Sequence, residues 1–243
     1  MIEINGLTKY FYPHKSWRDF IIASGIKPTV ALEGINLTIN AGEIFGLIGS
    51  NGAGKTTLLK ILATLILPDQ GSATINKHDI VEEFEYTKHF IGLVTGDERS
   101  FYWRLTGRQN LEFFGAFHGM NHAAINSRIR ELVDLMHIDS LDKRVGEFSA
   151  GMKQKLNLAR ALLHNPSALL MDEPTKSLDP FAATGTRQFI KKELSRRQGK
   201  TILLVTHSLR EIEEICDRVG IIKQGKLIAI GTPREMESQI TND

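Results

Sequence analysis

A glycine-rich segment between residues 49 and 57, with the sequence Gly-Ser-Asn-Gly-Ala-Gly-Lys-Thr-Thr, carries the residue types that hold phosphate groups. It matches the pattern G-x-x-x-x-G-K-[ST], in which glycines let backbone N–H groups approach phosphate oxygens. Lys55 is expected to reach the β- and γ-phosphates, and the hydroxyl of Thr56 to bind Mg²⁺. An apolar run precedes the segment and a helix-forming run, Thr57–Leu65, follows it. The candidate nucleotide-binding residues are Gly49, Ser50, Asn51, Gly52, Ala53, Gly54, Lys55, Thr56 and Thr57.

A second candidate site follows the apolar run Ala168–Met171, which ends in the acidic pair Asp172 and Glu173. Ligands of open α/β sheets bind beyond the carboxyl ends of the strands, so this pair and the glycine-rich segment can converge. Asp172 is expected to hold the Mg²⁺ shell, and Glu173 to polarise the attacking water as a general base. The two sites together predict hydrolysis of a bound nucleotide.

A histidine, His207, follows another apolar run, Ile202–Val205. Its side chain could contact a γ-phosphate and the attacking water at the same edge of the sheet. A lone histidine after a strand is more often structural. From its position alone, both interpretations stay open.

The elements that must position these residues alternate between strand-like and helix-like runs, which predicts an α/β fold with a mostly parallel sheet. Short β-like stretches between Ile2 and Ile39, and the run Gly71–Ile75, predict an antiparallel flap beside that sheet. Apolar residues at spacings of three and four predict helices at Asn121–Met136 and Met152–Leu163. The expected division is a nucleotide-binding core, residues 1–95 and 166–243, with a helical lobe, residues 96–165, inserted into it.

The composition limits the class of protein. With 243 residues and 42% hydrophobic content, the chain can bury the core of one domain or of two closely joined lobes. A formal net charge of only +2, with no basic stripe, argues against a nucleic-acid partner. The single cysteine, Cys216, excludes an internal disulfide and fits a reducing cytoplasm. There is no signal segment, and no apolar run approaches the roughly 18 residues of a membrane span, so we expect a soluble chain.

A stretch from Tyr10 to Thr29 is rich in aromatic and basic residues between two prolines. One interpretation is a surface flap whose aromatic side chains cover the edge of a sheet. The other is a docking element for a partner or for lipid headgroups. The sequence favours the first.

The segment between residues 148 and 154, Phe-Ser-Ala-Gly-Met-Lys-Gln, begins a predicted helix, where backbone N–H groups favour anions. It resembles the signature motif of ABC transporter ATPases, commonly written L-S-G-G-Q. In that family the motif of one subunit caps the γ-phosphate held by another, so that two nucleotides are enclosed in a head-to-tail dimer. The resemblance implies that Ser149 and Gly151 contact nucleotide.

Other motifs resemble the same family in the expected order and across nearly the whole chain. The resemblance implies a P-loop fold of the ABC ATPase type and catalytic roles for Glu173, His207 and Lys55. It also implies that Phe11 stacks on adenine, with Tyr10 and Tyr12 as alternatives. The matching motifs are Walker A at Gly49–Thr56, Walker B at Leu169–Asp172, the D-loop at Ser177–Asp179 and the switch histidine at His207.

Three features depart from the family pattern. Gly96 stands where a Mg²⁺-contacting glutamine is usual, so either Asp97 or Glu98 substitutes for it or water fills the gap. The signature carries Phe148, Ala150 and Met152 in place of leucine, glycine and glutamine. Lys176 replaces a small residue, and we expect it to be solvated or to pair with an acid across the dimer.

Three consecutive aromatic residues, Phe101, Tyr102 and Trp103, cannot all face one core, since neighbouring side chains diverge. In the family this neighbourhood receives a helix of the membrane subunit. Aromatic residues are also common in binding hot spots. The alternative is packing within the helical lobe.

The resemblance implies an ATP- and Mg²⁺-dependent ATPase subunit of an ABC transporter, resembling the exporter-type subgroup that pairs with six-helix permeases. Its partners would be a second ATPase subunit, as a homodimer, and an integral membrane permease, with no nucleic acid. It would lie in the cytoplasm, on the inner face of the cell membrane. The alternatives are a soluble ABC ATPase of an assembly complex, and a module that senses nucleotide without hydrolysing it.

Overall fold

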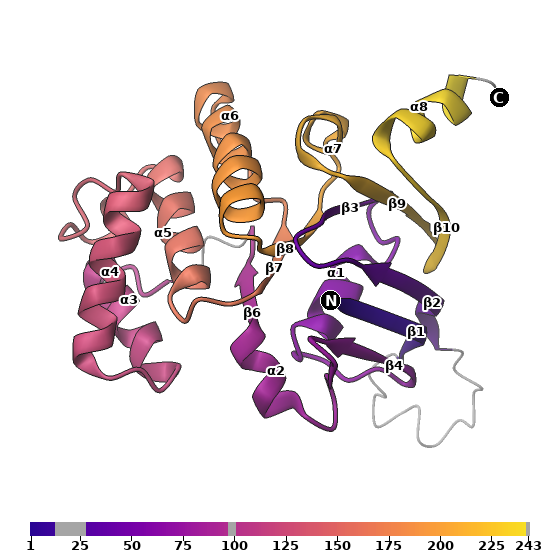
Figure 1. Ribbon diagram of the computed structural model, residues 1–243, viewed down its shortest axis with the longest axis horizontal. Helices are drawn as coiled ribbons and strands as arrows, with labels where there is room; N and C mark the ends of the chain where they lie inside the picture. The colour runs from indigo at the N-terminus through magenta and orange to yellow at the C-terminus, as the bar shows by residue number, and fades with distance from the viewer. Residues whose placement is uncertain (13–27, 97–100, 242–243) are drawn as a thin grey trace, which may run out of the picture.

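A computed structural model describes residues 1–12, 28–96 and 101–241 of the chain (Figure 1). Most of the stretch predicted as a flap or docking element lies outside these residues, as do Asp97 and Glu98. The predictions for those positions therefore stay predictions.

The larger sheet of the described residues has six strands, in the order β10-β9-β3-β8-β7-β6. Neighbouring strands from β9 to β6 run parallel, and only β10 is antiparallel to its neighbour β9. The predicted mostly parallel sheet is therefore confirmed. The strands are β3 (Ile44–Ile48), β6 (Ile91–Val94), β7 (Ala168–Asp172), β8 (Thr201–Val205), β9 (Arg218–Lys223) and β10 (Lys226–Gly231).

The smaller sheet is the predicted antiparallel flap. Its order is β2-β1-β4-β5, and every pairing in it is antiparallel. In Figure 1 it lies to the right of β6 and below β9 and β10. Its strands are β1 (Ile2–Phe11), β2 (Thr29–Ile39), β4 (Gln70–Ile75) and β5 (His78–Asp79).

Three helices, α3, α4 and α5, pack on one another on the opposite side of the molecule (Figure 1). None of the helices in the described residues combines the length and apolar character that crossing a bilayer requires. The helices are α1 (Lys55–Leu62), α2 (Phe84–Phe90), α3 (Gly107–Phe117), α4 (His122–Met136), α5 (Ala150–Leu162), α6 (Pro180–Gln188), α7 (Leu209–Ile215) and α8 (Pro233–Thr241), with a short 3₁₀ turn η3 (Val145–Glu147) and a π-helix η4 (Phe189–Arg197) that continues α6.

Strands β3, β7 and β8 of the larger sheet are buried on both faces, which explains why they are continuous apolar runs. Alternate residues of each strand point to opposite faces. Leu169 and Ile202 pack in one cluster with side chains of α4 and α5, whereas Leu170 and Leu203 pack in another with α1 and the smaller sheet. This double cover fixes the carboxyl ends of β3, β7 and β8 at one edge, where the candidate site residues follow.

Candidate functional site

The glycine-rich loop joins β3 to α1 and is held by two close backbone contacts. A Cβ atom on Gly49 would lie 2.2 Å from the carbonyl oxygen of Ile222, and one on Gly54 would lie 2.4 Å from that of Ala31. Gly54 also has a φ of 109°, which disfavours any side chain. Helix α1 begins at Lys55 rather than at Thr57, because Gly54 already occupies the position before the helix.

We expect Gly54→Ala to lower the free energy of unfolding by about 2–5 kcal/mol. A positive φ costs about 1–2 kcal/mol for a residue with a side chain, and overpacking costs about 1–3 kcal/mol more. Urea unfolding of the purified variant measures this loss. Gly119→Ala is the matched control, because Gly119 has a φ of 72° but no atom within 4 Å of an added Cβ. A loss no larger than that of the control would show that the contact with Ala31 does not constrain the loop.

The side chain of Lys55 is enclosed by the loop. It is 7% exposed, and its Nζ donates hydrogen bonds to the carbonyl oxygens of Gly49, at 2.7 Å, and Ser50, at 2.9 Å. The ammonium group thus lies inside the loop, beside the N-terminus of α1, and both features favour phosphate oxygens. Ser50, Asn51 and Gly52 are exposed, whereas Ala53 is buried.

The structure brings the two predicted Mg²⁺ ligands together. Asp172 is the last residue of β7, and its Oδ2 accepts a hydrogen bond of 3.2 Å from the hydroxyl of Thr56 on α1. Burial raises the pKa of Asp172 above its ordinary value, although the Thr56 hydroxyl opposes this shift. A carboxylate and a hydroxyl at this distance form the kind of oxygen set that Mg²⁺ binds.

Glu173 and His207 are also brought together. Oε1 of Glu173 lies 2.7 Å from Nδ1 of His207, which follows the neighbouring strand β8. Burial alone raises the pKa of Glu173, but hydrogen bonds from Lys176 and His207 outweigh it and lower the pKa below its ordinary value. The backbone of Glu173 is left-handed, with a φ of 49°, a conformation that persists only where the surroundings hold it.

Lys176 is exposed, as expected for a solvated side chain, but it also has a partner that the sequence did not predict. Its Nζ forms an ion pair of 2.8 Å with Oε2 of Glu173 in the same chain. The cause is the turn after β7, in which the N–H of Lys176 donates to the carbonyl oxygen of Glu173 at 3.0 Å. The spacing of three residues within a turn was the one signal in the sequence for this pair. Glu173 is therefore held between a lysine and a histidine.

Ser149 and Gly151 lie in a separate cavity of about 590 Å³. Ser149 precedes α5, and its Oγ accepts a hydrogen bond of 3.2 Å from the N–H of Met152. Ser177 and Asp179 also line this cavity, but none of its described lining residues belongs to the loop at residues 49–57. In one chain the signature segment and the glycine-rich loop therefore form two different surfaces.

Gly96 lies directly beside the acidic pair. A Cβ on it would be 3.4 Å from the carbonyl oxygen of Asp172 and 4.0 Å from that of Glu173. A small cavity of about 40 Å³ is lined by Gly96, Glu173 and Gln154, and the buried Nε2 of Gln154 has no hydrogen-bond partner among the described residues. The cavity is large enough for a water molecule, and the alternatives of water, Asp97 and Glu98 stay predictions.

Phe11 ends β1 and is 44% exposed. It pairs with Thr29 of β2, two residues before Ala31, whose carbonyl oxygen faces Gly54. Phe11 is therefore on the strand next to the one that contacts the loop. Tyr12 is 68% exposed, so the structure leaves it as an alternative platform for adenine.

We call Tyr102, Trp103, Phe113 and Phe117 the aromatic surface. All four side chains are exposed, and the rings of Tyr102 and Phe113 meet edge to face with centroids 5.0 Å apart. Phe101 instead is buried beneath the guanidinium of Arg160. The expectation that the three consecutive aromatic residues diverge is confirmed.

Comparisons with known proteins agree with this geometry. The sequence model of a family described as "ABC transporter" matches residues 32–176, and one described as "AAA domain, putative AbiEii toxin, Type IV TA system" matches residues 143–213. The chain is 39% identical over 219 residues to the ABC transporter ATP-binding protein NatA of Bacillus subtilis, covering 89% of this chain and 88% of that one. It is 36% identical to the linearmycin resistance ATP-binding protein LnrL of the same organism, covering 87% of this chain and 68% of the other.

Two solved structures are similar in fold. A dimeric post-hydrolysis state of the ATP-binding cassette MJ0796, bound to ADP and Pi, superposes with a TM-score of 0.81 at 26% identity, covering 96% of this chain and 99% of that one. CbiO1 from Clostridium perfringens, part of the ABC transporter complex cbiONQ, gives a TM-score of 0.81 at 25% identity, covering 98% and 91%.

Proposed function

Because the chain belongs to the family of ABC transporter ATP-binding proteins, we propose that Glu173 is the general base of its ATPase reaction and that His207 assists it. The observation that carries this assignment is the 2.7 Å contact between the two side chains, next to the pair formed by Asp172 and Thr56. All four residues follow or end elements at the carboxyl edge of one parallel sheet, where the glycine-rich loop also lies.

Each residue has a distinct chemical role. The loop at residues 49–57 holds the phosphates through its N–H groups, and Lys55 neutralises charge on the β- and γ-phosphates. Thr56 and Asp172 would hold Mg²⁺, which when bound supplies positive charge that stabilises the leaving phosphate oxygens. Glu173 orients the attacking water and accepts its proton, and His207 contacts the γ-phosphate. Phe11 stacks on adenine.

The working unit is a head-to-tail homodimer. In this arrangement Ser149 and Gly151 of one subunit cap the γ-phosphate in the loop of the other. The glycine-rich loop and the cavity lined by Ser149 and Gly151 are separate within one chain, which supports the dimer because a second subunit is needed to bring them together. The dimeric MJ0796 cassette offers a precedent of the same fold.

The partner is an integral membrane permease that docks on the aromatic surface, whose four residues belong to the lobe formed by residues 96–165. Aromatic side chains are common in binding hot spots, and the four of this surface are exposed. Similar proteins include a Nod factor export ATP-binding protein and a daunorubicin resistance ATP-binding protein, which supports an exporter. The chain then lies on the cytoplasmic face of the cell membrane.

We expect Trp103→Ala to weaken recovery of the permease with this chain about 30-fold or more, since a hot-spot residue contributes about 2 kcal/mol or more. Affinity purification from detergent-solubilised membranes, with the recovered membrane protein quantified by mass spectrometry, measures the effect. Ile228→Ala is the control, because Ile228 is similarly exposed but lies on β10. Equal recovery with both variants, or purification with soluble proteins alone, contradicts the docking proposal.

A further inference from the structure

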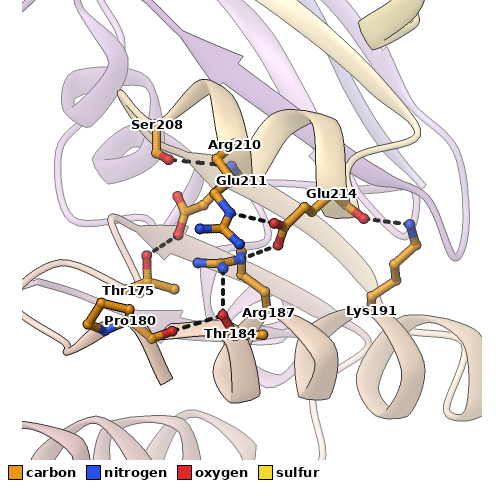
Figure 2. Close-up of polar contacts among 9 residues, drawn as sticks. All are labelled: Thr175, Pro180, Thr184, Arg187, Lys191, Ser208, Arg210, Glu211 and Glu214. Carbon is orange, nitrogen blue, oxygen red and sulfur yellow. Dashed lines mark hydrogen bonds and ion pairs between the residues drawn. The ribbon is translucent and has the colours of Figure 1, made fainter. Parts of the chain in front are cut away.

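One side-chain hydrogen bond links the turn that follows Glu173 to helix α7, which begins two residues after His207. The hydroxyl of Thr175 donates to Oε1 of Glu211 (Figure 2). Thr175 follows Glu173 by two residues, and Glu211 follows His207 by four. The contact therefore spans the same two chain segments as the pair in the site.

The Glu211 side of this contact is rigid. Glu211 is 1% exposed and lies in the first turn of α7, where a carboxylate is favoured by the helix N-terminus. Ser208 precedes that helix, and its Oγ accepts a hydrogen bond from the N–H of Glu211. The N–H of Ser208 in turn donates to the hydroxyl of Thr206 at 3.0 Å. His207 thus sits between two residues whose positions are fixed.

The Thr175 side is a tight turn whose conformation needs support. The N–H of Lys176 donates to the carbonyl oxygen of Glu173, and the N–H of Leu178 donates to the carbonyl oxygen of Thr175 at 3.2 Å. Glu173 and Ser177 both have positive φ angles, of 49° and 65°. Such angles cost about 1–3 kcal/mol each when the residue is not glycine. The hydrogen bond from the hydroxyl of Thr175 to the buried carboxylate of Glu211 stabilises this turn.

A second set of contacts ties α6 to α7 without touching either loop (Figure 2). The buried Arg187 donates from Nε to Glu214 at 2.5 Å and from Nη2 to the hydroxyl of Thr184 at 2.9 Å. Arg210 donates to the other oxygen of Glu214 at 2.6 Å, and Lys191 to its carbonyl. This cluster holds the helix pair. Between the two loops themselves, the bond from Thr175 to Glu211 adds a side-chain contact to the backbone hydrogen bond that the N–H of Glu173 donates to Val205 at 2.8 Å.

We propose that Thr175 and Glu211 are positioning residues that keep Glu173 and His207 within hydrogen-bonding distance, and so set the turnover number of the ATPase. The inference rests on the proposed role of Glu173. Neither residue need contact nucleotide, because each acts through the loop that it fixes. Displacing a reacting group by about 1 Å can lower a rate by about 100-fold, so loss of this anchor is expected to affect kcat.

The test compares Thr175→Val with Thr175→Ser in the full chain. Valine keeps the volume and removes the donor, whereas serine keeps the hydroxyl. We expect Thr175→Val to lower kcat about 10- to 100-fold with KM for ATP and the Kd for a fluorescent ATP analogue changed less than about 3-fold. Thr175→Ser is expected to stay within about 3-fold of the unaltered chain in kcat. Thr175→Ala gives the same test if valine prevents folding.

Thr184→Val is the matched control, because it removes the same group from the α6–α7 cluster, where Thr184 contacts Arg187 and Pro180. It is expected to lower the unfolding midpoint while leaving kcat within about 2-fold. The proposal is overturned if Thr175→Val keeps the full kcat, or if Thr184→Val lowers kcat as much. A wrong assignment of Glu173 as the general base gives a different result, because Glu173→Gln would then still hydrolyse ATP.

Discussion

Replacing Glu173 by glutamine is expected to abolish ATP turnover while ATP binding is kept. The amide has the size of the carboxylate and can still hydrogen-bond to His207, but it cannot accept the proton of the attacking water. General base catalysis contributes about 100- to 10,000-fold, so we expect kcat to fall by at least that factor. The Kd for ATP should change little, since Glu173 is outside the loop that holds the phosphates.

Two measurements check this result. Steady-state phosphate release gives kcat, and size-exclusion chromatography with ATP gives the oligomeric state. We expect the variant to elute as a dimer that persists, because the nucleotide that joins the subunits is not hydrolysed. Glu82→Gln is the control, since Glu82 is an exposed glutamate away from the site. Turnover of Glu173→Gln at the unaltered rate would falsify the assignment of the base.

Replacing Lys55 by methionine is expected to remove most of the affinity for ATP. Methionine keeps an aliphatic stem in the buried space of the loop but supplies no positive charge. Removing one partner of a buried, charge-assisted contact costs about 2–5 kcal/mol, which corresponds to about 30- to 4,000-fold in Kd. We expect turnover to fall together with ATP binding in this variant. Glu173→Gln instead lowers turnover and leaves ATP binding nearly unchanged, so the two variants can be told apart.

Isothermal titration with ATP and with ADP measures this loss. Lys60→Met is the matched control, because Lys60 lies on the same helix α1 but is exposed. The free energy of unfolding of both variants shows whether the loop still folds. An unchanged Kd in a folded Lys55→Met chain would contradict the role of the lysine and would place the phosphates elsewhere.

Much of the fold was predictable from local patterns. Strands buried on both faces must be continuous apolar runs, and β3, β7 and β8 all read that way. The glycine-rich motif was predictable because its glycines are required by contacts of the kind seen at Gly49 and Gly54. Likewise, Asp172 and Thr56 were expected to meet because parallel strands present their carboxyl ends at one edge.

Other parts of the site had no signal of this kind. The left-handed backbone of Glu173 carries no glycine, so apart from the spacing of three residues the sequence does not mark the turn that brings Lys176 back to it. The bond between Thr175 and Glu211 joins residues 36 positions apart. Such a contact depends on how β7, β8 and α7 are placed in space, and neither hydrophobic periodicity nor a motif encodes that distance. The sequence could therefore predict which residues gather at the candidate site, but not the contacts that hold them there.

The backbone packing of Gly49 and Gly54 has a consequence for the thermodynamics of ligand binding. Because contacts with Ile222 and Ala31, which belong to the fold itself, constrain the loop, its conformational entropy is lost when the protein folds. Association with ATP then does not include that loss, which otherwise amounts to about 1–2 kcal/mol for each residue that becomes ordered. The loop is preorganised, and part of the free energy of ATP recognition is drawn from the stability of the fold.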